Sequence, residues 1–108
     1  FSTNTIWEET ANKGTTRRDG SLVMLNKEQT HQHFGLARIG VATETAPYTW
    51  PILRAKSRMS PKMARGLVRA AKKQGALPSE WRGTFDPVYS DKWTSVETWN
   101  GELWVPVD

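Results

Sequence analysis

Cysteine is absent from the 108 residues. The chain therefore has no disulfide, no thiolate nucleophile and no cysteine-ligated zinc site, which fits a reducing compartment. Long apolar runs are absent too: no segment approaches the ~20 apolar residues that span a bilayer, and the N-terminus lacks the charged-then-apolar order of a secretory signal. These absences predict a cytoplasmic protein that acts without a membrane partner.

Catalytic signatures are missing as well. The sequence contains no nucleophile elbow, phosphate-cradling glycine-rich loop, HExxH helix or EF-hand loop. We therefore expect a protein that is not an enzyme and needs neither cofactor nor metal. Two alternatives stay open: His31 and His33 would form half of a metal site if their segment is extended, and Asp86 and Asp91 could converge around Mg²⁺ in a nuclease.

Negative charge is missing from the middle of the chain, although the formal net charge is only +4. Between Thr45 and Ser79 there are eight basic residues and no acidic one: Arg54, Lys56, Arg58, Lys62, Arg65, Arg69, Lys72 and Lys73. After Gly83 the sign reverses, and five acidic residues accompany only Lys92: Asp86, Asp91, Glu97, Glu102 and Asp108. Either the basic block binds an external anion, or the acidic quarter covers it within the fold.

Length and composition predict one folded domain over 1–108, with the polar segment 1–20 partly flexible. Hydrophobic residues make up 37% and charged residues 24%, a balance that argues against a disordered chain. Helix-like and strand-like segments both occur, so we expect an α+β fold with short antiparallel strands. Its main elements are a central basic helix and a C-terminal β-hairpin.

The clearest local prediction is an amphipathic helix over 60–74. Ser60 can cap it, Pro61 suits its first turn, Gly75 suits the position after its end, and Pro78 prevents its continuation. Gly66 in its interior indicates the close approach of another backbone. At about 100° per residue, the basic side chains share one face, and the packing face is expected to carry Met63, Leu67, Ala70 and Ala71.

Short strands are predicted before this helix. The first twenty residues, whose one apolar anchor is Ile6-Trp7, read as loop with one short strand, and 21–25 is an apolar run of strand length. From Asn26 two interpretations compete. Asn26 and Gln29 form a possible capping box for a helix, but Gly35 and Gly40 interrupt a helical pattern, which favours a strand near 33–43.

Two further segments connect the main elements. The stretch 46–51 is expected to be extended, because Pro47 and Pro51 each restrict the residue before them and disfavour a helix interior. A helical turn is expected near Ser79–Trp81. These segments join the N-terminal strands to the basic helix and to the C-terminal hairpin.

The C-terminal segment predicts a β-hairpin with a two-residue type I′ turn at Asn100-Gly101. With Trp99 opposite Glu102, Glu97 faces Trp104. One face of the hairpin, expected in the core, then carries Val96, Thr98, Leu103, Val105 and Val107. The other face carries Trp93, Glu97, Trp99, Glu102 and Trp104.

Positive charge beside aromatic residues predicts nucleic-acid binding, because Lys and Arg bind phosphates and aromatic rings stack on bases. We expect a non-enzymatic accessory protein that contacts DNA or RNA through Arg54, Lys56, Arg58, Lys62, Arg65, Arg69, Lys72, Lys73 and Trp50. The alternative is an inhibitor or adaptor that binds a host protein through Trp93, Trp99 and Trp104, since tryptophan is enriched at binding hot spots.

A small, basic, cysteine-free chain with six tryptophans is similar in general character to accessory proteins of bacteriophages and mobile elements. The resemblance rests on composition rather than on a motif, and it assigns no role to any residue. It implies that the partner is host nucleic acid or a host protein that handles it.

Overall fold

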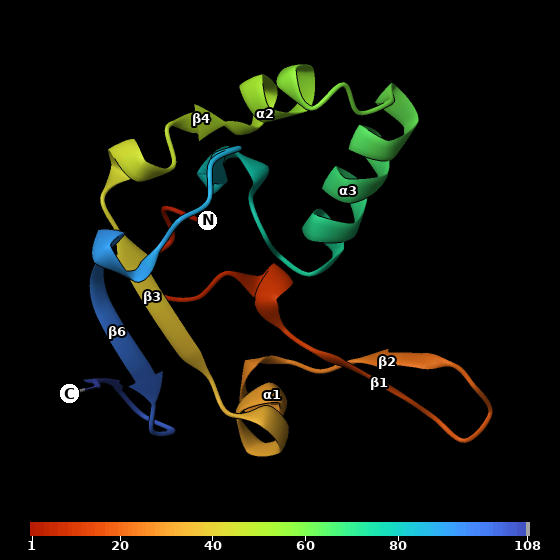
Figure 1. Ribbon diagram of the computed structural model, residues 1–108. Helices are drawn as coiled ribbons and strands as arrows, with labels where there is room; N and C mark the ends of the chain where they lie inside the picture. Colours follow the sequence, from red (N-terminus) through yellow and green to blue (C-terminus); the bar gives the residue numbers. More distant parts are fainter. Residues whose placement is uncertain (108) are drawn as a thin grey trace. The chain divides into compact units, whose positions relative to one another are not determined.

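The computed structural model describes residues 1–107, which form an α+β structure with three α-helices and three small antiparallel sheets (Figure 1). The helices are α1 (Lys27–Phe34), α2 (Trp50–Lys56) and α3 (Pro61–Lys73), with 3-10 turns η1 (Glu9–Ala11), η2 (Thr43–Thr45), η3 (Pro78–Glu80) and η4 (Ser90–Lys92). The strands are β1 (Gly14–Thr16), β2 (Leu22–Met24), β3 (Ala37–Val41), β4 (Tyr48–Thr49), β5 (Arg82–Gly83), β6 (Trp93–Trp99) and β7 (Trp104–Pro106). No helix in the described part is long and apolar enough to cross a bilayer.

The elements divide into two compact units, each built from two stretches of chain. The helical unit comprises residues 1–10 and 42–92 and contains α2, α3, β4 and β5. The sheet unit comprises residues 11–41 and the chain from Trp93 onward, and contains α1 with the remaining strands. The basic helix and the C-terminal hairpin therefore belong to different units.

The predicted basic helix is confirmed as α3, and its caps form as expected. The Ser60 hydroxyl accepts a hydrogen bond from the Met63 amide at 3.1 Å. At the other end Gly75 has a φ of +83°, which is the left-handed conformation that favours glycine. The Gly75 amide donates to the Lys72 carbonyl at 3.1 Å and the Ala76 amide to the Ala71 carbonyl at 3.0 Å. These two bonds make a complete Schellman motif.

The predicted packing face of α3 is correct at Ala71 and wrong at Met63 and Leu67. Ala64 and Ala71 are the buried residues of the helix, whereas Met63 is 59% and Leu67 45% exposed. The small alanines allow a neighbouring segment to approach the helix closely, so the buried stripe is rotated away from the larger side chains. Gly66 is not at a close contact either, since a Cβ placed there would meet no atom within 4 Å.

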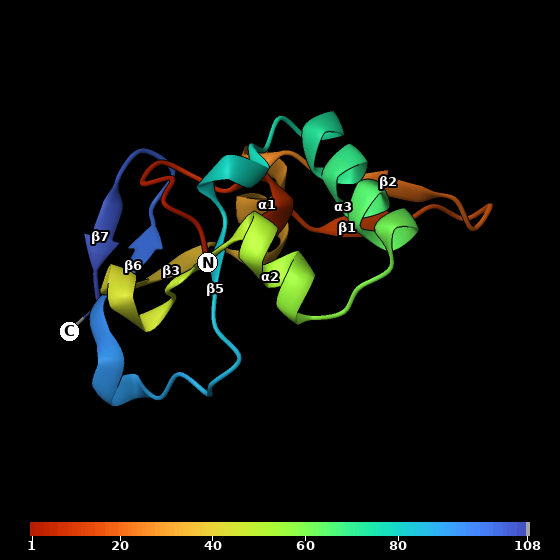
Figure 2. The same ribbon diagram turned by 90° about the horizontal axis from the view of Figure 1, so that it is seen from above.

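An unpredicted helix, α2, begins directly after strand β4 (Figure 1), and Figure 2 shows the same helix from above. The expected extended conformation is correct for Tyr48–Thr49, which pair with Gly83 and Arg82 of β5. It is wrong for Trp50 and Pro51, which start the helix. Proline is tolerated there because amide hydrogens in the first turn of a helix have no acceptor within the helix, so the hydrogen that proline lacks costs no hydrogen bond.

The sheet unit contains a helix, α1, that starts after Asn26. From the sequence, this helix was the less favoured of the two interpretations of the segment. Asn26 and Gln29 form a reciprocal capping box that starts α1: the Gln29 amide donates to Asn26 Oδ1 at 2.8 Å, and the Asn26 amide donates to Gln29 Oε1 at 3.0 Å. The helix ends at Gly35, and strand β3 follows. The predicted strand over 33–43 is therefore correct only from Ala37 to Val41.

The short strand predicted within the first twenty residues is present as β1, Gly14–Thr16. At the apolar anchor, the Asn4 side chain accepts hydrogen bonds from the Ile6 amide at 2.9 Å and the Trp7 amide at 3.2 Å, so these residues form a local turn. The predicted strand at 21–25 corresponds to β2, which pairs antiparallel with β1. The helical turn near Ser79–Trp81 is present as η3, Pro78–Glu80.

The C-terminal hairpin is present, but with a four-residue loop instead of the two-residue turn. Trp99 pairs with Trp104 and Glu97 with Pro106, a register two residues away from the predicted one. The Asn100 side chain accepts hydrogen bonds from the Glu102 and Leu103 amides, both at 2.8 Å, and thereby builds the longer loop. A shift of two residues preserves alternation, so Glu97, Trp99 and Trp104 still share a face.

The two faces of this sheet have exchanged their expected roles. Strands β3, β6 and β7 pair in that order, and Trp99 and Trp104 on one face are half-buried. On the expected core face, Val105 is 40%, Val107 50% and Leu103 66% exposed. Helix α1 takes the tryptophan side, because its Lys27 ammonium lies 3.5 Å from the centroid of the Trp99 ring.

Candidate nucleic-acid interface

Helices α2 and α3 present basic side chains from a common support, the segment 78–83. Turn η3 contacts both helices, and β5 contacts α2. The contact at β5 is tight: a Cβ added to Gly83 would lie 2.7 Å from Leu53 Cδ1. Glycine at this position therefore lets α2 lie against β5, which sets where Arg54 emerges relative to α3.

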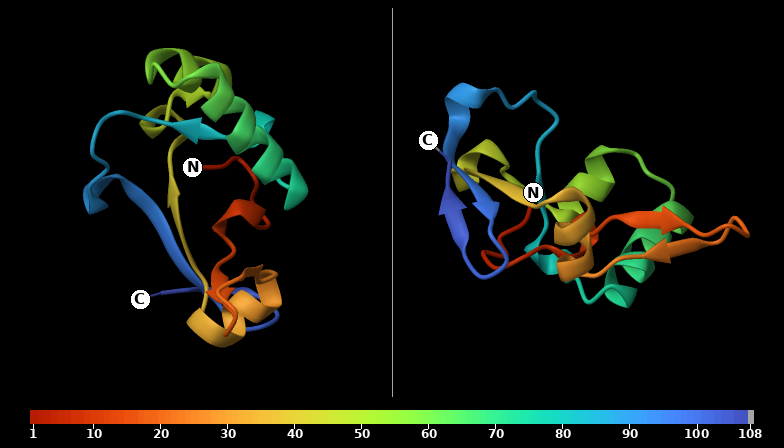
Figure 3. Two further views of the ribbon diagram at one scale, coloured as in Figure 1. Left: turned by 90° about the vertical axis from the view of Figure 1, so that its right-hand side faces the viewer. Right: turned by 90° about the horizontal axis from the view of Figure 1, so that it is seen from below.

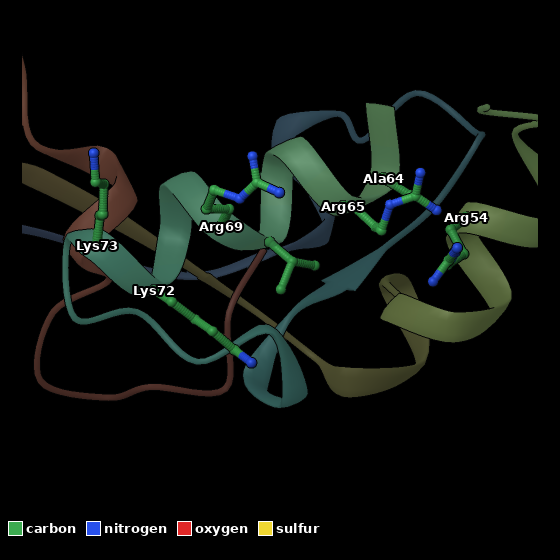
Figure 4. Close-up of a pocket in the computed structure, with 7 residues that line it drawn as sticks. Arg54, Ala64, Arg65, Arg69, Lys72 and Lys73 are labelled. Carbon is green, nitrogen blue, oxygen red and sulfur yellow. The ribbon is translucent and has the colours of Figure 1, made fainter. Parts of the chain in front are cut away.

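An open hollow of about 600 Å³ lies between the basic side chains of α2 and α3 (Figure 4). Its lining contains five cations and two apolar side chains: Arg54, Arg65, Arg69, Lys72 and Lys73, with Ala64 and Val68. Figure 4 shows a row that runs from Lys72 and Lys73 past Arg69 to Arg65, which lies beside Arg54 of α2. The fold thus adds Arg54, from a different helix, to the end of the row of cations on α3.

No carboxylate of the helical unit neutralises this row. None of its five cations forms an ion pair with a described carboxylate of that unit within 4 Å. On α3, Arg65, Arg69 and Lys73 succeed one another at a spacing of four residues, and each such like-charged pair destabilises a helix by about 0.2–0.5 kcal/mol. A bound anion would remove this repulsion.

The remaining predicted basic residues lie outside the hollow. Lys62 shares the basic face of α3 near its N-terminus and is exposed. Lys56 is engaged internally, because its ammonium lies 5.3 Å from the centroid of the Tyr48 ring, within the range of a cation–π interaction. Trp50, expected to assist by stacking, packs edge-on against Trp81 with ring centroids 5.2 Å apart.

Arg58 occupies an unusual backbone conformation in the loop between α2 and α3. Its φ is +58°, the one positive value at a non-glycine position among the described residues. The left-handed region costs a residue with a Cβ roughly 1–2 kcal/mol, and Gly or Asn is the usual choice at such a helix end. The Arg58 side chain is exposed, so it buries little surface that would offset this cost.

Replacing Arg58 with glycine is expected to stabilise the protein. Relief of backbone strain outweighs the added freedom of the unfolded chain, so we expect the free energy of unfolding to rise by about 0.5–1 kcal/mol. Urea denaturation of Arg58→Gly, with Arg58→Asn as a second left-handed residue, measures this change. A loss of stability in both variants would show that the arginine side chain supports the fold.

The tryptophans of the alternative, protein-binding surface are mostly engaged within the sheet unit. The Trp99 and Trp104 rings lie 5.2 Å apart, and the Arg38 guanidinium lies 4.3 Å from the Trp104 ring centroid. Arg38 also forms an ion pair with Glu97, with Nε and Oε1 2.9 Å apart. Trp93 is 42% exposed, and it is the tryptophan of this set with the most accessible ring.

The histidine alternative depended on an extended segment, and this segment is helical. His31 and His33 both lie in α1, where a spacing of two residues places side chains on different faces. Across residues 1–107, no group of three or more His, Asp or Glu side chains is arranged to hold a metal ion.

Two further basic residues, Arg17 and Arg18, were not among the predicted site residues. They lie at the tip of the β1–β2 hairpin and are exposed. Their positive charge is less evident in the sequence than that of the long central block, because the pair is short and the acidic Asp19 follows it directly. The turn signal Asp19-Gly20 combined with two adjacent arginines could have identified a basic hairpin tip.

Comparison with known proteins finds no family model that matches the chain, no matching curated protein and no matching solved structure.

Proposed function

We propose that the protein binds nucleic acid through phosphate contacts made by the basic side chains of α2 and α3. The observation that supports this proposal best is the row of five cations around one open hollow, without a carboxylate of the same unit among them. Nucleic-acid backbones present closely spaced negative charges, and a row of Lys and Arg neutralises several of them at once. The partner is thus a polyanion rather than a single small anion.

The form of the hollow supports contacts to the backbone more than to the bases. It is wide and open, and apart from the cations its lining contributes only Ala64 and Val68, which have no side-chain hydrogen-bonding groups. Phosphate contacts position a protein on nucleic acid, whereas base edges are read by side chains with matched donors and acceptors. We therefore propose binding that depends weakly on sequence and strongly on salt.

A four-residue alanine variant tests this proposal. Replacing Arg54, Arg65, Arg69 and Lys72 with alanine should weaken binding to a labelled DNA duplex and flatten its salt dependence. Each phosphate contact contributes roughly −0.9 to the slope of log affinity against log salt, so loss of four contacts changes the slope by roughly 3.6. Fluorescence anisotropy over a range of salt concentrations measures both quantities.

The control for this experiment is Lys92→Ala, which removes one exposed positive charge outside the basic block. Alanine is the best helix former, so the helices should persist, and circular dichroism verifies this. If the four-residue variant binds DNA and RNA duplexes and single strands with the affinity and slope of the control, the proposed function is wrong.

A further inference from the structure

The ribbon formed by β1 and β2 pairs with no other strand in the described part of the chain. It extends away from α1 of its own unit (Figures 1 and 3). Leu22 is 69% and Met24 46% exposed, and neither strand contains a buried residue. An isolated two-stranded hairpin is marginally stable in water, so its base requires an anchor.

That anchor is α1. The Leu25 amide donates to the Lys13 carbonyl at 2.8 Å, which continues the pairing of the two strands, and Leu25 itself is only 8% exposed. The Lys13 amide donates to the Thr30 hydroxyl at 3.3 Å, and Thr30 is 2% exposed within α1. The ribbon is therefore fixed at its base, and in the described part of its own unit no further strand extends its pairing.

The tip of the ribbon is a structured turn with two unpaired arginines. The Arg17 amide donates to the Ser21 carbonyl at 2.8 Å, and Asp19 accepts hydrogen bonds from the Ser21 amide at 2.9 Å and the Ser21 hydroxyl at 2.6 Å. Both bonds lower the pKa of Asp19, and the bond from the Ser21 hydroxyl has the larger effect. Asp19 holds the turn, and neither Arg17 nor Arg18 forms an ion pair with a described carboxylate of the sheet unit.

We propose that the β1–β2 ribbon is an arm that enters the groove of duplex DNA, with Arg17 and Arg18 bound to the flanking phosphates. This inference rests on the proposed nucleic-acid binding and adds a second contact, in the other unit of the chain. The arm combines positive charge at its tip with the exposed apolar side chains of Leu22 and Met24. Such side chains can contact thymine methyl groups in the major groove.

The shape of the arm selects DNA over RNA. The major groove of B-form DNA is about 12 Å wide and accepts a two-stranded β-ribbon. The major groove of an A-form RNA duplex is deep and narrow, and side chains cannot read it. A protein that uses this arm therefore binds a DNA duplex more tightly than an RNA duplex of the same sequence.

The test compares the full chain with its Arg17→Gln/Arg18→Gln variant on a DNA duplex and on the matching RNA duplex. Loss of two phosphate contacts should reduce the magnitude of the salt slope on DNA by about 2, and the slope on RNA should stay unchanged. The turn survives these substitutions, because its hydrogen bonds use the backbone and Asp19 rather than the arginine side chains. Lys92→Gln controls for the loss of a positive charge elsewhere.

The outcomes separate this inference from the proposed function. Suppose that the tip variant has the same affinity and salt slope on DNA as the Lys92→Gln control, while the four-residue variant of α2 and α3 loses affinity. The proposal that the ribbon binds DNA is then wrong, and the proposed function stands. If the tip variant loses affinity equally for DNA and RNA duplexes, the arginines bind phosphate but the groove assignment is overturned. If neither variant loses affinity, both proposals are wrong.

Discussion

Replacing Trp99 with alanine is expected to lower the free energy of unfolding by about 2–4 kcal/mol. Trp99 is the last residue of the middle strand, β6, and the centroid of its ring lies 5.2 Å from that of Trp104 and 3.5 Å from the Lys27 ammonium. Trp→Ala changes in cores cost about 3–5 kcal/mol, and the partial exposure of this side chain reduces the figure. Urea denaturation followed by circular dichroism measures the loss without depending on tryptophan fluorescence.

Trp93→Ala is the matched control, since it removes the same side chain from the same strand. Trp93 is 42% exposed and therefore gives up less buried surface, so we expect a loss of about 1 kcal/mol or less. Equal losses in the two variants would contradict the central role of the stacked tryptophans and their cations.

This difference bears on the alternative function, binding to a host protein through the tryptophans. A binding defect in Trp99→Ala would be ambiguous, because the same substitution removes the packing between the hairpin and α1. Trp93 is the informative position: its ring is accessible, and its removal should leave the sheet intact. A hot-spot tryptophan contributes at least about 2 kcal/mol to binding, well above the expected change in stability.

The sequence predicted α3 because every signal for it is local. Ser60, Pro61 and Gly75 act within one turn of the helix ends, and the structure uses all three. Helix α1 also has a local signal, the Asn26–Gln29 capping box, but the following glycines were given more weight. Gly35 lies at the end of α1 and Gly40 lies in β3. Neither glycine is inside the helix, so neither weakens it.

Faces were harder to predict than elements, because they depend on what packs against them. The alternation of β6 and β7 correctly grouped Trp99 with Trp104, but it could not show which face α1 would cover. The preference for aliphatic side chains in a core pointed to the wrong face. In the structure the Lys27 ammonium lies 3.5 Å from the centroid of the Trp99 ring and 5.6 Å from that of the Trp104 ring, and these contacts join residues far apart in the sequence.

The candidate site shows the same limit. Helical spacing alone places Arg65, Arg69 and Lys73 in one row, and this part could be predicted. The approach of Arg54 to Arg65 depends on the support that 78–83 gives to both helices. No periodicity in the sequence encodes that support, which arises from contacts of η3 with both helices and of β5 with α2.

Gly83→Ala is expected to destabilise the helical unit by about 1–3 kcal/mol, the usual cost of overpacking. The new methyl group would lie 2.7 Å from Leu53 Cδ1 and 2.8 Å from Leu53 Cδ2, so either the leucine or the whole of α2 must move. Gly66→Ala provides the control, because nothing lies within 4 Å of that position. There the better helix propensity of alanine should stabilise α3 by up to about 1 kcal/mol.

The double variant Gly83→Ala/Leu53→Ala decides whether this contact sets the position of α2. Removing the leucine side chain makes room for the new methyl group, so the combined loss of stability should be smaller than the sum of the single losses by at least about 0.5 kcal/mol. Affinity for a DNA duplex should follow the same pattern, because a displaced α2 moves Arg54 away from Arg65. Additive losses, or unchanged affinity in Gly83→Ala, would show that α2 takes its position from other contacts and that the hollow does not depend on β5.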